Sequence, residues 1–254
     1  MKFLSLVLVY LILLFNLCSG HNIQAASNKG RIELEKSGEV FWEVKTKEKM
    51  VALTFDDGPH PLYTPQILDT LAKYRAKATF FVIGAHAAEY PYIIKRQVDE
   101  GHEIANHTYN HNYRLYKNAN YLKNELKKTS NTIQSIAGYQ PSLFRPVGGY
   151  YNDLIINTAV KNDYRVIMWS WNHDTKDWRK PGVNKIINNV ISDTRPGDII
   201  LLHDAGGDRS QTVKALDKIL AALQKKGYEC VTVSEMLYRS KAILPNPTQI
   251  LPFF

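Results

Sequence analysis

Two histidines and two aspartates carry side chains that could bind and use a metal ion. His107 and His111 are four residues apart, and on a helical turn this spacing places both imidazoles on one face, within reach of one cation. Taken alone, such a pair more often belongs to the surface or the core. Asp56 and Asp57 follow an apolar run and precede Gly58, so one carboxylate could complete a site of the kind that holds catalytic zinc, iron or cobalt. The other carboxylate would then serve as a general base for water.

Three further side chains extend this candidate site. His203 ends the apolar run 199–202 and is a candidate general acid, and Asp177 could hold its imidazole in the required tautomer. Arg145 could pair with Asp56 and keep that carboxylate oriented and ionised. Simpler alternatives are a capping or core histidine for His203 and a surface salt bridge for Arg145. Together the residues indicate hydrolysis by an activated water molecule.

An alternation of strands and helices would position these residues. Strands are expected at residues 40–44, 50–55, 78–83, 102–105, 143–145, 164–169, 198–202 and 228–233. Helices are expected at residues 63–75, 85–100, 120–137, 153–161, 183–192 and 212–226. This order predicts an α/β fold of parallel β-α units, either a nearly closed barrel or an open doubly wound sheet. In a barrel the functional residues follow the carboxyl ends of strands, which is where the candidate residues stand.

Composition bounds the class of partner. Hydrophobic residues make up 44% of the chain and charged residues 22%, as in ordinary globular proteins. The formal net charge is +8, which favours anionic surfaces such as a cell wall or a membrane. No run of five basic residues occurs, so the sequence does not predict nucleic-acid binding.

The amino terminus has the pattern of a secretory signal. Lys2 is followed by an apolar run over residues 3–17 and then by the small residues Ser19 and Gly20. The run is short for a membrane-spanning helix, which needs roughly 20 residues, but an uncleaved anchor stays an alternative. Without the leader only Cys230 remains, so no disulfide within the chain is expected. These features predict an exported protein that is extracellular, wall-associated or anchored to the membrane and facing outward.

Five short motifs resemble those of the polysaccharide deacetylase family, also called the NodB-homology group or carbohydrate esterase family 4. They stand in the family's order over about residues 50–236, and although each motif is weak alone, the set is specific. The motifs are Thr54-Phe-Asp-Asp-Gly-Pro59, His107-Thr-Tyr-Asn-His111, Arg145-Pro-Val-Gly-Gly149, Asp174-Thr-Lys-Asp-Trp178 and Leu201-Leu-His-Asp204.

The resemblance implies a fold, an activity and a metal. The fold is a distorted (β/α) barrel of about seven parallel strands. The activity is hydrolysis of N-acetyl groups on a cell-wall-type polysaccharide, peptidoglycan or chitin oligomers, with release of acetate. The metal is a divalent ion, usually Zn²⁺, with Co²⁺ and other divalent ions as alternatives, and its ligands would be Asp57, His107 and His111.

The resemblance also implies roles around the metal. Asp56 would be the catalytic base and His203 the catalytic acid, with Arg145 tethering Asp56 and Asp177 tethering His203. In this reaction a metal supplies activated water, the oxyanion needs stabilisation, and the leaving nitrogen needs a proton.

The remaining implied residues bind the substrate. Trp178 and Leu201 would shape the pocket for the acetyl methyl group, and a backbone N–H near Gly148 would help to hold the oxyanion. Family members often carry a second proline and an aromatic residue after the arginine of the third motif, whereas this chain has Val147 and Gly148. The N–H is kept, so this departure affects substrate preference and the groove wall rather than the type of reaction.

Four divisions of the chain follow from these patterns. They are a signal peptide or anchor at residues 1–26, an extension at 27–48, the deacetylase domain at 49–240 and an extended tail at 241–254. The chain is expected to be a monomer. Alternatives to an N-deacetylase are an O-deacetylase of acetylated xylan-type chains and a non-catalytic wall-binding protein, although the latter would be expected to lose a catalytic residue and none is missing here.

Overall fold

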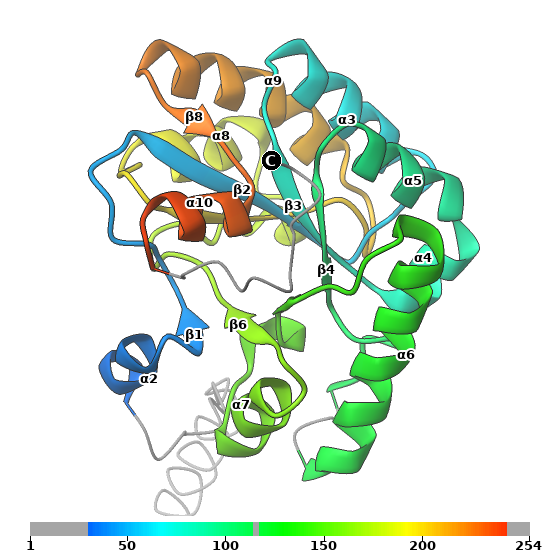
Figure 1. Ribbon diagram of the computed structural model, residues 1–254. Helices are drawn as coiled ribbons and strands as arrows, with labels where there is room; N and C mark the ends of the chain where they lie inside the picture. The colour runs from blue at the N-terminus through cyan, green and yellow to red at the C-terminus, as the bar shows by residue number, and fades with distance from the viewer. Residues whose placement is uncertain (1–29, 114–116, 243–254) are drawn as a thin grey trace, which may run out of the picture.

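The computed structural model describes residues 30–113 and 117–242 (Figure 1). The predicted leader and residues 243–254 of the predicted tail lie outside the described residues. Within the described part of the chain, no helix combines the length and apolar character needed to span a membrane.

A curved sheet of parallel strands forms the centre of the fold. Its strands follow the order β1-β6-β5-β4-β3-β2-β7, and every pairing along this path is parallel. The bounds are β1 Val40–Phe41, β2 Met50–Asp56, β3 Ala78–Val82, β4 Glu103–Asn106, β5 Leu143–Phe144, β6 Arg165–Ile167 and β7 Ile199–His203. A short β8, Glu229–Cys230, pairs with the amino end of β2. The predicted distorted barrel of about seven parallel strands is therefore confirmed.

The ends of the sheet come together without pairing as strands. β1 and β7 stand at opposite ends of the strand order, and an isolated bridge between Glu43 and Asp198 links the segments beside them. A second bridge joins Asp174 to Leu201, so the segment after β6 runs along β7 toward its carboxyl end. This segment carries Asp177 up to the end of β7, where it contacts His203.

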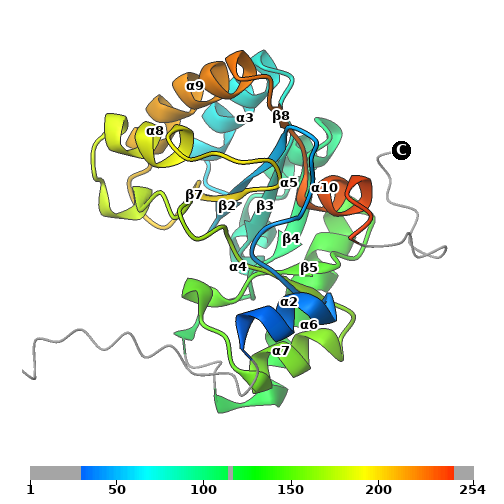
Figure 2. The same ribbon diagram turned by 90° about the vertical axis from the view of Figure 1, so that its left-hand side faces the viewer.

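Helices surround the sheet (Figures 1 and 2). Their bounds are α2 Arg31–Ser37, α3 Tyr63–Lys73, α4 Gly84–Glu89, α5 Pro91–Asp99, α6 Ala119–Ala137, α7 Asp153–Val160, α8 Val183–Ile191, α9 Ser210–Lys225 and α10 Val233–Arg239. One apolar core packs α3, α5, α8 and α9 against outward-facing side chains of the sheet, such as Leu53 and Phe80. A separate core inside the curve joins Met50, Phe81 and Ile199 to Met236 of α10.

Several predicted elements differ in extent from the observed ones; the strand expected at residues 40–44, for example, covers only Val40–Phe41. Residues 85–100 form two helices, α4 and α5, which meet at Tyr90 because Pro91 has no backbone N–H to continue the first helix. The last strand was expected to reach residue 233, but β8 ends at Cys230 and α10 follows. Thr232 caps α10 by accepting a hydrogen bond from the Glu235 N–H, a capping signal that is visible in the sequence.

The segment before β2 belongs to the same sheet. β1 lies within the predicted extension of residues 27–48, and it pairs with β6 through Val40 and Phe41. α2 packs Leu34 into the apolar core that also holds Val40 and Val166. The boundary placed at residue 49 stays a prediction.

Candidate active site and metal centre

Three potential metal ligands converge at the carboxyl ends of β2 and β4. Nε2 of His111 lies 3.1 Å from Oδ1 of Asp57, and Nε2 of His107 lies 3.5 Å from the same oxygen. The three ligand atoms all lie within 4.8 Å of one another. Two ligand atoms that are each about 2.0–2.1 Å from a tetrahedral ion are about 3.3 Å apart, so this donor set fits a small divalent cation.

The histidine pair is held by a loop rather than by a helix. The expectation of a helical turn was wrong: His111 has φ 51°, and the segment from His107 to His111 has no helical structure. Glu125 of α6 holds this loop, because its carboxylate accepts the backbone N–H groups of Tyr109 at 3.0 Å and of Asn110 at 2.7 Å. Sequence reasoning missed Glu125, which stands in a helix with no motif around it.

The hydrogen bonds of the ligands prepare them to bind a cation. Nδ1 of His107 donates to the Arg145 carbonyl at 2.8 Å, which leaves Nε2 directed toward Asp57. Burial alone would raise the pKa of Asp57, but hydrogen bonds from His107 and His111 outweigh it and hold the pKa well below its usual range. Asp57 is therefore ionised. Its backbone, with φ 75°, is braced by His86, whose Nδ1 donates to the Asp57 carbonyl at 2.8 Å.

Asp56 is tied to a buried arginine. Nη1 of Arg145 lies 2.7 Å from Oδ1 of Asp56, and the same nitrogen donates to Thr54 at 2.8 Å. The other guanidinium nitrogens donate to the carbonyls of Ile167 and Met168, so each nitrogen has a partner although the side chain is entirely buried. The second Asp56 oxygen, Oδ2, lies 3.9 Å from Nε2 of His107, on the side of the metal ligands.

His203, at the end of β7 beside β2, is held by Asp177. Nδ1 of His203 donates to Oδ1 of Asp177 at 2.7 Å, and Oδ2 of Asp177 accepts the His203 N–H and the Thr212 hydroxyl. Burial would lower the pKa of His203, but the hydrogen bond and charge of Asp177 and the charges of Asp56 and Asp57 raise it to about 9. The ring is therefore a proton donor near neutral pH.

Comparison with known proteins identifies the family. A family model described as polysaccharide deacetylase matches residues 43–167. A peptidoglycan-N-acetylglucosamine deacetylase of Bacillus cereus is 50% identical over 207 residues, which are 82% of this chain and 97% of that protein. This chain belongs to the polysaccharide deacetylase family.

Two further relatives of this polysaccharide deacetylase carry related names. A chitooligosaccharide deacetylase of Bradyrhizobium is 39% identical and matches 71% of this chain and 87% of that protein. The crystal structure of the Bc1960 peptidoglycan N-acetylglucosamine deacetylase superposes with a TM-score of 0.77 at 37% identity, covering 82% of this chain and 96% of that one.

The expected substrate-binding residues of the deacetylase stand in different surroundings. Trp178 is 43% exposed, and the Arg179 guanidinium lies over its ring, 4.4 Å from the centroid. Leu201 is buried in β7, two residues before His203. Gly148 has φ 61° in the turn after β5, a conformation that favours glycine.

The wall beside Gly148 is more aromatic than the third motif predicts. A side chain at Gly148 would come within 3.0 Å of the Tyr113 ring, and Tyr150 lies next to that ring with a centroid separation of 6.3 Å. Tyr113 also packs edge-on against His111 at 5.6 Å. Two tyrosines therefore stand beside Gly148, and sequence reasoning missed Tyr113.

Asp204 is a further buried acid that sequence reasoning left without a role. Its side chain is fully buried and accepts the Thr64 hydroxyl at 2.6 Å, and burial raises its pKa to about 7. A side chain at Gly58 would overlap this carboxylate, so Asp204 packs against the turn that follows Asp57. The last motif contains Asp204, but its sequence context does not show which turn it touches.

Proposed function

We propose that this chain is a metal-dependent hydrolase that removes N-acetyl groups from a cell-wall polysaccharide and releases acetate. One observation carries the proposal: the Asp57, His107 and His111 donor set stands beside Asp56, which Arg145 tethers, and Asp56 pairs in register with His203, which Asp177 tethers. A base and an acid close to a cation site are what hydrolysis of an amide requires.

The proposed reaction assigns one proton movement to each tethered group. A bound cation supplies Lewis-acid activation of the carbonyl and of water. Asp56 accepts the proton of the attacking water as the new C–O bond forms. Nε2 of His203 gives a proton to the sugar nitrogen as the C–N bond breaks, because Nδ1 is held by Asp177. The products are acetate and a free amino sugar, and the backbone N–H near Gly148 donates to the oxyanion.

Burial fixes the proposed base and the carboxylate that holds the proposed acid. The side chains of Asp56 and Asp177 are almost entirely shielded from solvent, so their partners fix them in one orientation. Trp178 and Leu201 would border the acetyl methyl group, from the segment that precedes the acid and from the strand that carries it.

Zinc is the proposed metal, with cobalt as an alternative. Two imidazole nitrogens and one carboxylate oxygen form a three-ligand set that leaves a coordination position for substrate, as in catalytic zinc sites. The polymer substrate would be an N-acetylglucosamine-containing chain, in line with the names of the relatives.

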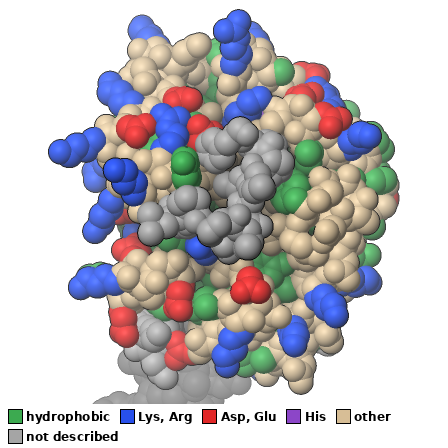
Figure 3. Space-filling model, viewed as in Figure 1, with side chains coloured by type: hydrophobic (Ala, Val, Ile, Leu, Met, Phe, Trp, Pro, Cys, Tyr) green, Lys and Arg blue, Asp and Glu red, His purple; other side chains and the backbone are tan. Residues whose placement is uncertain are grey.

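Location and assembly complete the proposal. A cell-wall substrate requires export, for which residues 1–26 would act as a signal or anchor, and the chain would act as a monomer at the wall. On the face shown in Figure 3, Lys and Arg side chains are scattered among Asp and Glu and do not form a basic patch of the kind that binds nucleic acid.

Metal removal is the direct test of the proposal. Treatment with a chelator is expected to abolish acetate release from purified peptidoglycan and chitooligosaccharides, and added Zn²⁺ is expected to restore it. Acetylated xylan serves as the comparison substrate and separates N- from O-deacetylation by the amount of acetate released. Acetate release that persists in metal-free protein would contradict the proposed mechanism, and release from xylan alone would change the substrate class.

The Asp177–His203 pair predicts a specific pH profile. His203 acts in its protonated form, so activity is lost as pH rises through its pKa, which Asp177 raises. Replacing Asp177 with asparagine removes that charge, so the alkaline fall of kcat/KM is expected to move to lower pH. Profiles of kcat/KM for wild type and Asp177→Asn measure this shift. The half-exposed Asp174→Asn variant is the control, and an unshifted alkaline limb in Asp177→Asn would remove His203 from the role of acid.

A further inference from the structure

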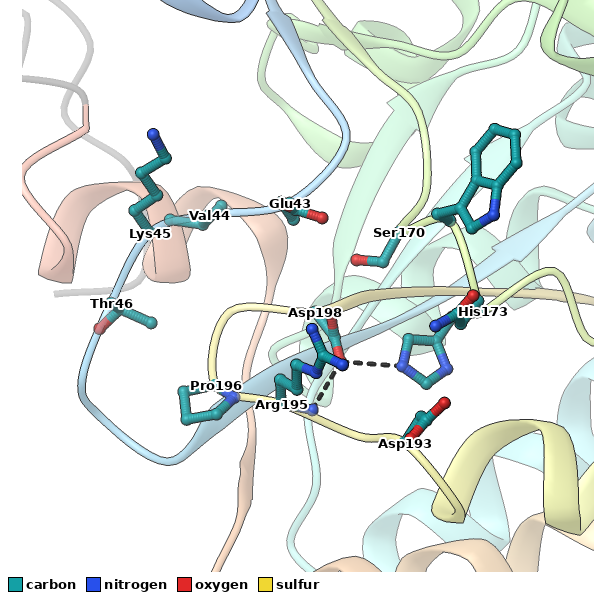
Figure 4. A pocket seen from close by; sticks show the side chains of 12 residues that line it. Glu43, Val44, Lys45, Thr46, Ser170, His173, Asp193, Arg195, Pro196 and Asp198 are labelled. Atoms are coloured by element: carbon teal, nitrogen blue, oxygen red, sulfur yellow. Dashed lines mark hydrogen bonds and ion pairs between the residues drawn. The ribbon is translucent and has the colours of Figure 1, made fainter. Parts of the chain in front are cut away.

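A second recess lies away from the candidate catalytic residues, at the amino end of β7. It has a volume of about 340 Å³, which falls within the size range of small-molecule sites. Three segments line it, around residues 43–46, 170–173 and 193–198 (Figure 4). Asp198 precedes β7 and His203 ends it, and at about 3.3 Å per residue these positions are roughly 17 Å apart. The recess is therefore separate from the catalytic site.

The floor of the recess is built from a buried, fully bonded pair. His173 is 1% exposed, and its Nε2 donates to Oδ2 of Asp198 at 2.8 Å while its Nδ1 donates to the Asn189 carbonyl at 3.1 Å. The same Asp198 oxygen accepts the Arg195 N–H at 2.6 Å. Figure 4 shows the His173 ring directed at Asp198. Both imidazole nitrogens are occupied, so the floor suits binding in a preformed shape rather than acid–base chemistry.

Trp171 stands at this recess with an unusually exposed side chain. It is 84% exposed, more than any other large apolar side chain in the described part of the chain. Ser170 and His173, on either side of it in the chain, are buried and hydrogen-bonded, so the backbone that carries the indole is held on both sides. An indole in this position offers a flat apolar face and an N–H donor to a ligand.

The charges around the recess select against an anionic ligand. Its two cationic side chains, Lys45 and Arg195, stand among three carboxylates, Glu43, Asp193 and Asp198. The lining therefore carries no excess of positive charge that would hold a phosphate or a polyanion. Hydrogen-bonding groups of both kinds beside a flat aromatic face match a neutral sugar, which has hydroxyl groups at its edge and C–H groups on its face.

We propose that Trp171 and this recess form a second binding site, for neutral N-acetylated sugar rings of a polysaccharide chain. The site would hold the polymer on the protein while the catalytic residues act on another part of it. The choice of polymer rests on the proposed function. The recess and the exposed indole are features of the structure and do not depend on it.

Retention on insoluble chitin tests this site. Chitin is uncharged, so the net charge of the protein does not drive its retention. Wild type and Trp171→Ala are both assayed as full chains in the presence of a chelator, which stops turnover. Wild type is expected to bind chitin with a Kd about tenfold lower than that of Trp171→Ala, because a stacked aromatic anchor commonly contributes that much to affinity. The activity of Trp171→Ala on a dimer of N-acetylglucosamine, measured with metal, is expected to stay within about twofold of wild type, since the substitution is at the surface.

Tyr92→Ala is the matched control. Tyr92 is 63% exposed on α5 and does not line the recess, so its loss is expected to leave retention unchanged. Equal retention of wild type and Trp171→Ala, or an equal fall for Tyr92→Ala, would overturn the proposal. A parallel loss of dimer hydrolysis in Trp171→Ala would also overturn it, because Trp171 would then belong to the catalytic groove. If wild type released no acetate from any substrate, the proposed function would fail while the chitin comparison still tested this site.

Discussion

Replacing His107 with alanine is expected to remove the bound divalent metal and acetate release together. The variant loses one of three ligand atoms, and Asp57 loses a hydrogen bond that keeps it in place. Metal affinity should fall by more than about 100-fold, because even residues that only hydrogen-bond to a metal ligand contribute 10- to 100-fold to metal affinity. Metal content of the purified protein and acetate release at a fixed zinc concentration measure the two effects.

The controls for His107→Ala separate ligation from folding. His60→Ala removes a histidine outside the donor set, whose Nδ1 accepts the Leu62 N–H, and should keep both metal and activity. His107 is buried, so circular dichroism must show that His107→Ala remains folded at the assay temperature. Stoichiometric zinc in a folded His107→Ala protein would assign the ion to other residues.

Metal binding by wild type should also depend on pH. Burial lowers the pKa of His107, but the charge of Asp56 and the hydrogen bond with Asp57 outweigh it and raise the pKa. Protons therefore compete with the cation for Nε2, and the apparent metal affinity is expected to rise with pH through that pKa.

Replacing Asp56 with asparagine is expected to keep the metal and stop turnover. Asparagine has nearly the shape of aspartate but cannot take a proton from water, so kcat should fall by about 10²–10⁴-fold. The metal should stay because Asp57, His107 and His111 are unchanged. Metal analysis together with acetate release distinguishes this outcome from that of His107→Ala.

Asp56→Asn also tests the pairing with Arg145. The guanidinium keeps its bonds to Thr54, Ile167 and Met168 but loses the one carboxylate that pairs with it within the described residues. Leaving a buried charge without a counter-ion costs about 3 kcal/mol, so a lower melting temperature is expected and activity must be measured below it. Asp174→Asn, at a half-exposed position, should change neither property. Retained turnover in Asp56→Asn would assign the base to another group.

The succession of strands and helices along the chain and the convergence of polar residues could be predicted from the sequence. Apolar runs such as residues 50–55 are typical of strands buried on both faces, and the polar residues after them are expected at one edge of a parallel sheet. These are local patterns that need no knowledge of distant contacts. The break at Pro91 was equally visible in the sequence but was not predicted, although proline lacks the N–H that a helix interior needs.

The supporting contacts could not be predicted in the same way. Glu125 holds the histidine loop from a helix, and His86 braces Asp57 from α4. Tyr113 fills the space left by Gly148, and Asp204 packs under Gly58. Each contact depends on how a loop folds back, and loop conformation is set by packing rather than by periodicity.

The sequence by itself determined the class of fold, the family and the side chains able to take part in chemistry, because strand and helix periods and short motifs are local. Tertiary structure alone decided that Nε2 of His107 and His111 face one oxygen of Asp57, that Arg145 is wholly buried against Asp56, and that Trp171 stays exposed beside a rigid recess. These features arise where segments far apart in the chain meet, and the free energy of those contacts depends on distances that no single segment specifies.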